Sequence, residues 1–190
     1  MSVTAAATAK KKRVSTRAPL PQGDRVLSSK KFVYITQKHG AKQVHYDFRL
    51  ALHGALKSWS IPKGPTVHPG EKRLAVEVED QPLEHAKFEG IIPEGEEGAG
   101  TVMLWDKGTW QPIGDPEKGY ENGKIEFLLH GEKLKGQWVL MKMKTHGKKP
   151  NWMLVKVKDR YANMLAEDKL LNTKSVKTGR TLDEIAQSHK

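Results

Sequence analysis

Short stretches in which apolar and polar residues alternate follow one another along the chain from Phe32 onward. The clearest of them are KFVYITQKH, QVHYDFRLALHG, KRLAVEVED and NWMLVKVKD, and turn-forming residues such as Gly54, Pro62 and Pro82 separate the stretches. Alternation with a period of two residues is typical of β-strands that bury one face. A series of about eight such strands with little helix predicts an all-β protein, either a β-barrel or a β-sandwich.

Several local patterns refine this prediction. Asp106–Gly108 interrupts TVMLWDKGTWQPI and predicts a hairpin turn, and HGEKLKG predicts a second one. A short helix is expected around PLEHAKFEG. Another is expected in TLDEIAQSHK, where Thr181 suits the N-cap and Glu184 occupies the capping-box position. The five tryptophans all lie in predicted strands and are interpreted mainly as core residues.

The positive charge is concentrated at the N-terminus. Residues 1–31 contain eight Lys or Arg residues and one Asp, and the whole chain has a net charge of +11. This segment has little hydrophobic periodicity, so it is expected to be a disordered basic arm. A basic arm attracts nucleic acid because its binding releases the counterions condensed on the phosphates. A solvated tail that only improves solubility is the alternative interpretation.

Composition also limits where the protein is expected to act. The sequence has no stretch of about 20 apolar residues, so no membrane-spanning helix is predicted. The basic run Lys10–Arg13 has no apolar segment behind it and does not resemble a secretory signal. The absence of cysteine excludes disulfides and thiolate metal ligands. Together these features favour a cytoplasmic protein.

One predicted strand places three polar side chains of complementary chemistry on a single face. In QVHYDFRL, His45, Asp47 and Arg49 alternate with apolar residues, and His39 has the same parity although Gly40 intervenes. Two imidazoles and a carboxylate form a three-ligand set suited to manganese, zinc or iron. The neighbouring guanidinium suits a phosphate oxygen. Taken alone, however, these residue types are more often found on an ordinary solvent-facing strand.

A second predicted strand shows similar alternation. In KRLAVEVEDQP, Arg73, Glu77, Glu79 and Gln81 are expected to share a face, opposite the apolar residues of the stretch. Lys63 stands in the loop SIPKGP, where the flanking proline and glycine restrict its direction. Together with the first strand, these side chains predict either a phosphate-binding site or a lattice of surface salt bridges.

Six blocks of sequence, taken in order, resemble a known family. They are QKHGAKQVHYDFRL, LKSWSIPKGP, KRLAVEVEDQPL, FEGIIPEGEEGAGTVMLWDKGTW, LHGEKLKGQWVLMKMK and NWMLVKVKDRYA. They resemble the phosphoesterase domain of bacterial DNA ligase D, the repair ligase of non-homologous end joining, and its stand-alone relatives. The resemblance covers residues 32–162, which are expected to form the domain. Residues 163–190 resemble the linker that leads into the ligase domain of some ligase D proteins.

The resemblance implies a compact, closed or partly closed β-barrel with a polar crescent on its outer surface. It implies a manganese-dependent hydrolase, with another divalent transition metal as the alternative, that acts on DNA 3′ ends or primer-templates. Members of the family remove a 3′-terminal ribonucleoside and then the remaining 3′-phosphate, which leaves a 3′-OH that a ligase can seal. The expected partners are DNA ligase and polymerase components of double-strand-break repair.

The resemblance also implies roles for residues at matching positions. The implied metal ligands are His39, His45 and Asp47, the implied contacts to the scissile phosphate are Arg49 and Arg73, and Lys63 and Glu79 are implied as a further basic contact and a supporting acid. These roles come from the family, and strand parity shows only that they are compatible with one site.

The chain departs from the family pattern at positions that matter for chemistry. Gln81 stands in VEDQP where the family has a phosphate-contacting histidine, and glutamine cannot deliver the proton of a general acid. His85 stands where the family usually has tyrosine, so we expect that the imidazole has moved by one helical turn. Glu97 replaces another common tyrosine, without a predicted consequence.

These departures leave other functions open. The main alternative is a catalytically weak or inactive DNA-end-binding or scaffold module of the same repair system, because Gln81 replaces the family histidine. A basic β-domain whose polar face binds only partner proteins is the third interpretation. The intact triad and both arginines favour the active enzyme.

Overall fold

The computed structural model describes residues 32–144 and 150–188, so the predicted disordered arm lies outside the described residues. Residues 1–30 and 31–190 are separate units, and the description concerns the second. Its strands are β1 (Val33–Gly40), β2 (Val44–Leu52), β3 (Ala55–Ile61), β4 (Lys72–Gln81), β5 (Gly90–Ile92), β6 (Gly100–Ile113), β7 (Lys124–Gly131), β8 (Lys135–Lys142) and β9 (Asn151–Lys156).

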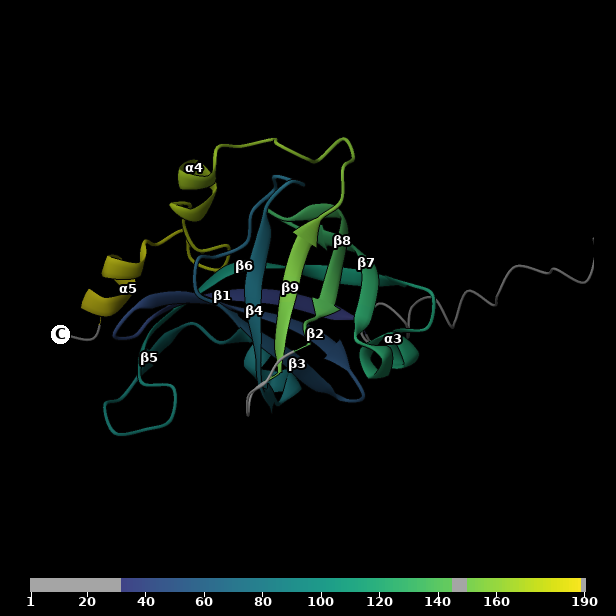
Figure 1. Ribbon diagram of the computed structural model, residues 1–190. Coiled ribbons are helices and arrows are strands. Elements are labelled where there is room, and N and C mark those ends of the chain that lie inside the picture. The colour runs from purple at the N-terminus through teal and green to yellow at the C-terminus, as the bar shows by residue number, and fades with distance from the viewer. Residues whose placement is uncertain (1–31, 145–149, 189–190) are drawn as a thin grey trace, which may run out of the picture. The chain divides into compact units, whose positions relative to one another are not determined.

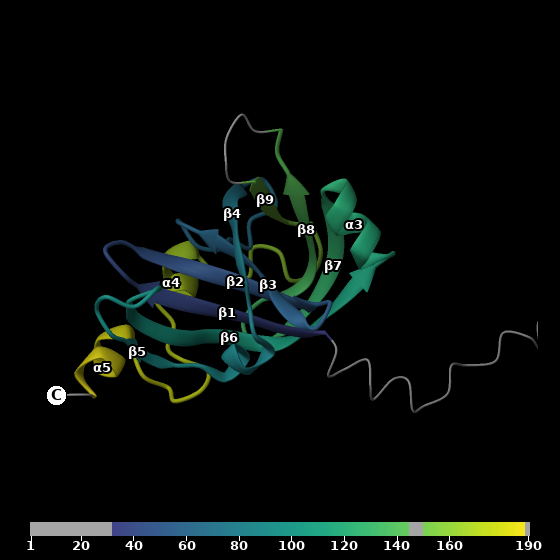
Figure 2. The same cartoon turned by 90° about the horizontal axis from the view of Figure 1, so that it is seen from below.

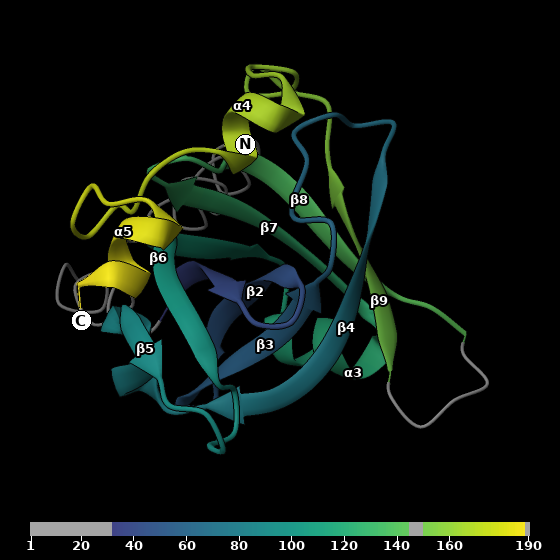
Figure 3. The same cartoon turned by 90° about the vertical axis from the view of Figure 1, so that its left-hand side faces the viewer.

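The sheet closes into a barrel because β1 pairs on both of its sides. The strand order is β1-β2-β3-β4-β9-β8-β7-β6-β5, and β1 also pairs with β6. Eight strands therefore form a closed antiparallel barrel, and the short β5 is added at β6 (Figures 1 and 3). This confirms the predicted all-β barrel and excludes the β-sandwich. Closure removes the exposed edge strands that an open sheet would have.

Aromatic side chains fill the inside of the barrel. All five tryptophans are buried there, which confirms their interpretation as core residues: Trp59, Trp105, Trp110, Trp138 and Trp152. Phe48 and Phe127 lie 6.1 Å apart between ring centroids, and Trp59 and Trp152 lie 5.7 Å apart. Such separations are typical of favourable aromatic pairs. Because these rings occupy the interior, a site of any size has to lie on the outer face or at an end of the barrel.

The described residues include four short helical segments outside the barrel wall. They are the 3-10 helix η1 (Leu83–Lys87) and the α-helices α3 (Pro116–Asn122), α4 (Glu167–Leu171) and α5 (Leu182–Gln187). Figures 1 and 2 place α4 and α5 on one side of the barrel and α3 on the opposite side. The predicted helices around PLEHAKFEG and TLDEIAQSHK are confirmed. The Thr181 hydroxyl caps α5 by accepting the N–H of Glu184 at 3.2 Å.

The predicted hairpin at Asp106–Gly108 is wrong. β6 continues through these residues without a turn. A Cβ atom at Gly108 would lie 2.0 Å from the carbonyl oxygen of His130, so this glycine permits β7 to approach closely and does not form a turn. A tertiary contact of this kind is invisible in the local sequence, where the same residue types predict a turn.

Helix α3 was not predicted, although its capping residues are present in the sequence. The Asp115 side chain accepts the N–H groups of Glu117 and Lys118, and Gly123 ends the helix in a left-handed conformation. Seven residues are too few for a helical period to stand out. None of the helices in the described part of the chain has the length and hydrophobicity needed to cross a membrane.

The segment after β9 packs back onto the barrel. Leu170 of α4 and Ile185 of α5 are buried in the same apolar cluster as the barrel core. Residues far apart in sequence therefore share one core. The domain boundary at residue 162 and the linker role of residues 163–190 remain predictions.

Candidate functional site

The polar side chains of β2 lie on the outer face of the barrel. Phe48 belongs to the core, so His45, Asp47 and Arg49, which alternate with the core residues, face outward. The neighbouring strand β1 runs antiparallel, and its register places His39 directly opposite His45. The ladder thus brings together the residues that strand parity predicted.

Three donor groups converge at this point. Nδ1 of His39 lies 3.1 Å from Nε2 of His45 and 3.7 Å from a carboxylate oxygen of Asp47. Nε2 of His45 lies 3.4 Å from the other carboxylate oxygen. Donor atoms bound to one transition-metal ion at about 2.0–2.2 Å lie roughly 3.0–3.5 Å apart. Two ring nitrogens this close need a shared proton or a cation between them, so the cluster fits a divalent metal ion.

Electrostatics keep the carboxylate of this cluster ionised. Burial raises the pKa of Asp47, but the imidazoles of His39 and His45, 3.7 and 3.4 Å from the carboxylate, and the charge of Arg49 outweigh this effect. The pKa of Asp47 therefore lies well below its ordinary value. The pKa of His45 is raised, chiefly by the neighbouring carboxylate of Asp47. A permanent anion at this position favours the binding of a cation.

Arg49 is held in a fixed orientation beside the cluster. Its Nη2 lies 3.6 Å from the Asp47 carboxylate. Its Nε donates to Oε1 of Gln37 at 3.0 Å, and its Nη1 donates to Oγ of Ser58 at 2.7 Å. Burial lowers the pKa of Arg49, opposed by the charge of Asp47, but a guanidinium remains protonated in proteins. Arg49 therefore presents a preorganised positive charge next to the cluster of His39, His45 and Asp47.

The two residues that orient Arg49 were not singled out from the sequence. Gln37 has the parity of His39 in β1, so the alternation argument could have included it. Ser58 lies on β3 directly opposite Arg49, and only the pairing of the strands identifies it. Both side chains are fully buried.

A β-bulge in β4 overturns the prediction that its polar residues share one face. Ser58 of β3 pairs with Val78, and Leu56 pairs with Gln81, so β4 contains one more residue than β3 between these two pairs. Beyond the extra residue, the side chains of β4 that faced inward by parity face outward. Gln81 therefore lies on the outer face with Ser58, whereas Glu77, of the same parity, lies on the inner side.

Arg73 and Glu77 have structural partners on this other side of β4. Glu77 accepts the indole N–H of Trp152 at 3.1 Å. The guanidinium of Arg73 pairs with Glu71 at 3.1 Å and also with Glu167 of α4. Trp152 and Glu167 come from distant segments, which is why a pattern within one strand could not reveal them.

A pocket of about 780 Å³ adjoins the cluster. Seven of the nine predicted site residues line it, namely His39, His45, Asp47, Arg49, Glu79, Gln81 and His85. The loop between β5 and β6 adds Glu97, for which the sequence predicted no consequence. The other two predicted residues, Lys63 and Arg73, line a second pocket of about 450 Å³. The structure therefore does not gather all of the predicted phosphate contacts in one place.

The 3-10 helix η1 supplies one wall of the first pocket. His85 stacks on Phe88 with 5.2 Å between ring centroids, and Nε2 of Gln37 donates to the Phe88 carbonyl at 3.0 Å. Burial lowers the pKa of His85, and the charge of Arg49 lowers it further. Gln81 is the last residue of β4 and only His85 lies in η1, so the expectation that one helical turn separates them is wrong. Both residues line the pocket, and the replacement of the family histidine by His85 stays a prediction.

Comparisons with known proteins find relatives of this chain. A family model described as the DNA Ligase D 3′-phosphoesterase domain matches residues 37–142. The chain is 48% identical over 176 residues, 90% of its length, to the multifunctional non-homologous end joining protein LigD of Pseudomonas aeruginosa. It is 37% identical over 147 residues, 76% of its length, to the multifunctional non-homologous end joining DNA repair protein LigD of Mycobacterium tuberculosis. The matched regions make up 21% and 18% of these proteins, so the chain spans only a small part of their length.

Proposed function

Since the chain belongs to the DNA ligase D 3′-phosphoesterase family, we propose that it is a metal-dependent hydrolase that processes DNA 3′ ends. Its substrates are ends with a 3′-terminal ribonucleoside or a 3′-phosphate, and its product is a 3′-OH that a ligase can seal in non-homologous end joining. The observation that carries this proposal is the convergence of His39, His45 and Asp47 beside Arg49 in one pocket.

His39, His45 and Asp47 would hold the metal ion. Three protein ligands leave coordination positions for water and substrate, which is typical of catalytic metal sites and not of structural ones. Two imidazoles and a carboxylate suit manganese, with another divalent transition metal as the alternative. When bound, such an ion neutralises phosphate charge and lowers the pKa of a bound water.

Arg49 is proposed to stabilise negative charge on the non-bridging phosphate oxygens. Gln37 and Ser58 already orient its guanidinium, so little reorganisation is needed when the charge develops. Arg73 and Lys63 remain predicted phosphate contacts. Arg73 is paired with Glu167, so it can meet a substrate only by giving up that partner.

His85 is the proposed proton donor of the η1 wall, because Gln81 has no group that titrates. Burial lowers the pKa of His85, which favours the neutral imidazole in the free protein. A phosphate bound beside it adds negative charge, which favours the imidazolium that donation requires. Glu79, which lines the same pocket, is the proposed supporting acid.

Substrate affinity is proposed to come partly from residues 1–31. A basic arm contacts the phosphate backbone without reading its sequence, and it makes binding depend on salt. DNA ends or primer-templates are the proposed ligands, and ligase and polymerase repair proteins are the proposed partners.

The test uses two labelled primer-templates, one with a single 3′ ribonucleotide and one with a 3′-phosphate. Each is incubated with the full chain with and without manganese, beside His45→Ala. His53→Ala is the matched control, because His53 is an exposed histidine that pairs with Glu117. We expect manganese-dependent processing that His45→Ala abolishes and His53→Ala retains. Processing that survives in His45→Ala would contradict the metal site.

One observation favours a second candidate function. Gln81 lines the pocket where the family has a histidine, so turnover is weak or absent if His85 does not replace it. The chain would then bind DNA ends without processing them. Manganese and DNA binding without product from either substrate would select this function, and product from one substrate only would identify the step that survives.

A further inference from the structure

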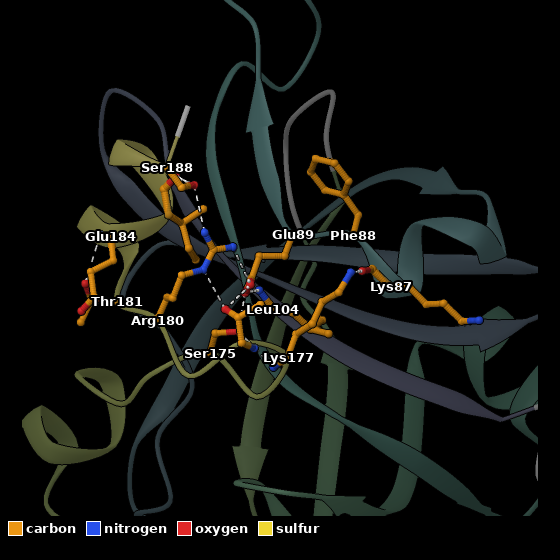
Figure 4. A network of polar contacts seen from close by, with 12 residues as sticks. Lys87, Phe88, Glu89, Leu104, Ser175, Lys177, Arg180, Thr181, Glu184 and Ser188 are labelled. Carbon is orange, nitrogen blue, oxygen red and sulfur yellow. Dashed lines mark hydrogen bonds and ion pairs between the residues drawn. The ribbon is translucent and has the colours of Figure 1, made fainter. Parts of the chain in front are cut away.

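A buried carboxylate joins the C-terminal segment to the turn behind η1. Glu89 lies between η1 and β5, and its side chain is only 1% exposed. Its carboxylate accepts hydrogen bonds from the backbone N–H of Leu104 at 3.0 Å, the hydroxyl of Ser175, the hydroxyl of Thr178 at 2.6 Å and the guanidinium of Arg180 at 3.5 Å (Figure 4). Three of these four donors come from residues 175–180.

The contact with Leu104 shows what the carboxylate does for the barrel. β5 pairs with Gly100–Val102 of β6 and β7 pairs with Gly108–Ile113, so no described strand covers the edge of β6 between them. In this gap Glu89 accepts the N–H of Leu104, and Val176 donates to the carbonyl of Leu104 at 3.0 Å. Glu89 and the C-terminal segment therefore provide hydrogen-bond partners for the N–H and the carbonyl of Leu104. Backbone groups that are buried need such partners.

Two further contacts join the same segment to η1. Nζ of Lys177 donates to the carbonyl of Lys87, the last residue of η1, at 2.6 Å (Figure 4). Val176 and Ala86 of η1 each pack against the same apolar cluster on the outer face, formed by Ile35, Ala51, Leu56 and Leu104. The C-terminal segment thus supports η1 through a hydrogen bond, a shared apolar cluster and the network around Glu89.

His85, in the same stretch, lines the pocket. Phe88, next to Glu89, stacks on His85, and its carbonyl accepts a hydrogen bond from Gln37. Gln37 also orients Arg49. The residues of this stretch that contact the C-terminal segment therefore lie within four positions of His85 in the chain.

We infer that residues 175–180 form a brace that positions the η1 wall of the pocket, with Glu89 as the central positioning residue. The inference rests on the proposed phosphoesterase function, for which η1 supplies His85. The metal-ligand triad stands on the paired strands β1 and β2, whose register does not depend on the brace. Loosening the brace should therefore displace His85 and leave the triad in place.

The test compares Glu89→Ala with Glu84→Ala in the full chain, since Glu84 is an exposed acid within η1. Stacking is followed through the ring-proton NMR shift of His85 in metal-free protein, assigned with His85→Gln. Manganese affinity is measured by calorimetry, and kcat/KM is measured on a 3′-phosphate substrate. Glu89→Gln, which keeps the shape and one acceptor oxygen, should be intermediate.

For Glu89→Ala we expect a loss of His85 stacking, a fall of kcat/KM by about tenfold to a hundredfold, and manganese affinity within about twofold of the unmodified chain. Glu84→Ala should change none of these. If Glu89→Ala does not fold, Arg180→Gln, which alters only the more exposed end of the network, is measured in the same way.

Two results would overturn the brace. One is unchanged stacking and kcat/KM in Glu89→Ala, and the other is a parallel loss of manganese affinity, which indicates general destabilisation. If the unmodified chain has no turnover, the proposed function fails, yet the NMR and manganese measurements still decide whether the brace positions His85.

Discussion

Two buried aspartates, Asp106 inside the barrel and Asp47 on its outer face, meet opposite surroundings. Asp106 accepts hydrogen bonds from four neutral donors: the hydroxyl of Tyr34 at 3.0 Å and the backbone N–H groups of Lys107 at 3.0 Å, Lys133 at 2.9 Å and Leu134 at 2.9 Å. Burial raises the pKa of Asp106 in spite of these donors. Its role is architectural, because it joins β6 to the turn between β7 and β8.

The surroundings of Asp47 are ionisable and looser. His39, His45 and Arg49 lie 3.4–3.7 Å from its carboxylate, longer than ordinary hydrogen bonds, and its pKa is lowered. A saturated carboxylate has no capacity left for a ligand. A carboxylate with loosely placed charged neighbours in a pocket retains that capacity. Asp106 therefore serves the fold, whereas Asp47 is the proposed metal ligand.

The largest effect is expected when Asp47 is changed. Asp47→Asn removes the anion of the triad, and we expect kcat to fall by about a thousandfold, with manganese binding lost. The melting temperature should shift by only a few degrees, since the position is partly open to the pocket. Steady-state kinetics, calorimetric titration with manganese and thermal unfolding measure the three quantities. Retained manganese binding would contradict the assigned role.

Asp106→Asn is the matched change on the inner side. An amide would turn N–H groups toward backbone N–H donors, so we expect a loss of about 3 kcal/mol in the free energy of unfolding. Urea denaturation measures this loss. The folded fraction should keep its kcat, and an inactive protein of unchanged stability would break the comparison.

The η1 wall offers a smaller test on the outer face. His85→Ala is expected to lower kcat/KM about tenfold more than Gln81→Ala, because of the two side chains only imidazole exchanges a proton near neutral pH. Both variants are compared on the 3′-phosphate substrate across a range of pH. Equal, negligible effects would remove His85 from the proposed mechanism.

The smallest effect is expected at Lys133, next to Asp106. Burial lowers the pKa of Lys133 to about 8, with the charge of Asp106 opposing this. Between pH 8 and the ordinary pKa of lysine, the unfolded chain keeps the proton on Lys133, whereas the folded chain has lost it. The free energy of unfolding should therefore rise with pH in this window. We expect this rise to amount to about 1 kcal/mol after solvent screening, and Lys133→Met should lack it. Urea denaturation at pH 7.5 and pH 10 compares the two proteins, and parallel slopes would contradict the shift.

The strand-borne part of the site could be predicted from the sequence because its evidence is local. His45, Asp47 and Arg49 lie in an uninterrupted strand, where parity alone decides which face a side chain takes. The same rule was wrong in β4, because a bulge resets the parity between Glu77 and Gln81. A bulge depends on how the neighbouring strand pairs, which the residues of β4 do not reveal.

The supports of the site depend on contacts between distant segments. Ser58 is recognised only through the register of β2 with β3, and the four donors to Glu89 come from β6 and the C-terminal segment. The ionic partner of Arg73, Glu167, is likewise 94 residues away. The all-β fold was predicted because alternation recurs in nearly every stretch, and the barrel was expected only from the resemblance to a family. Long-range contacts of this kind leave no local pattern.

The position of β9 has a consequence for the order in which the chain assembles during synthesis. β9 pairs with β4 on one side and β8 on the other, and Leu154 lies opposite Arg73. Before residues 151–156 are made, β4 and β8 therefore keep unpaired edges, which favour pairing with other chains. Ribosomes add about 5–20 residues per second, so nascent chains pass through this open stage for a short time at each round of translation. The segment matched by the family model ends at residue 142, before the strand that closes the wall.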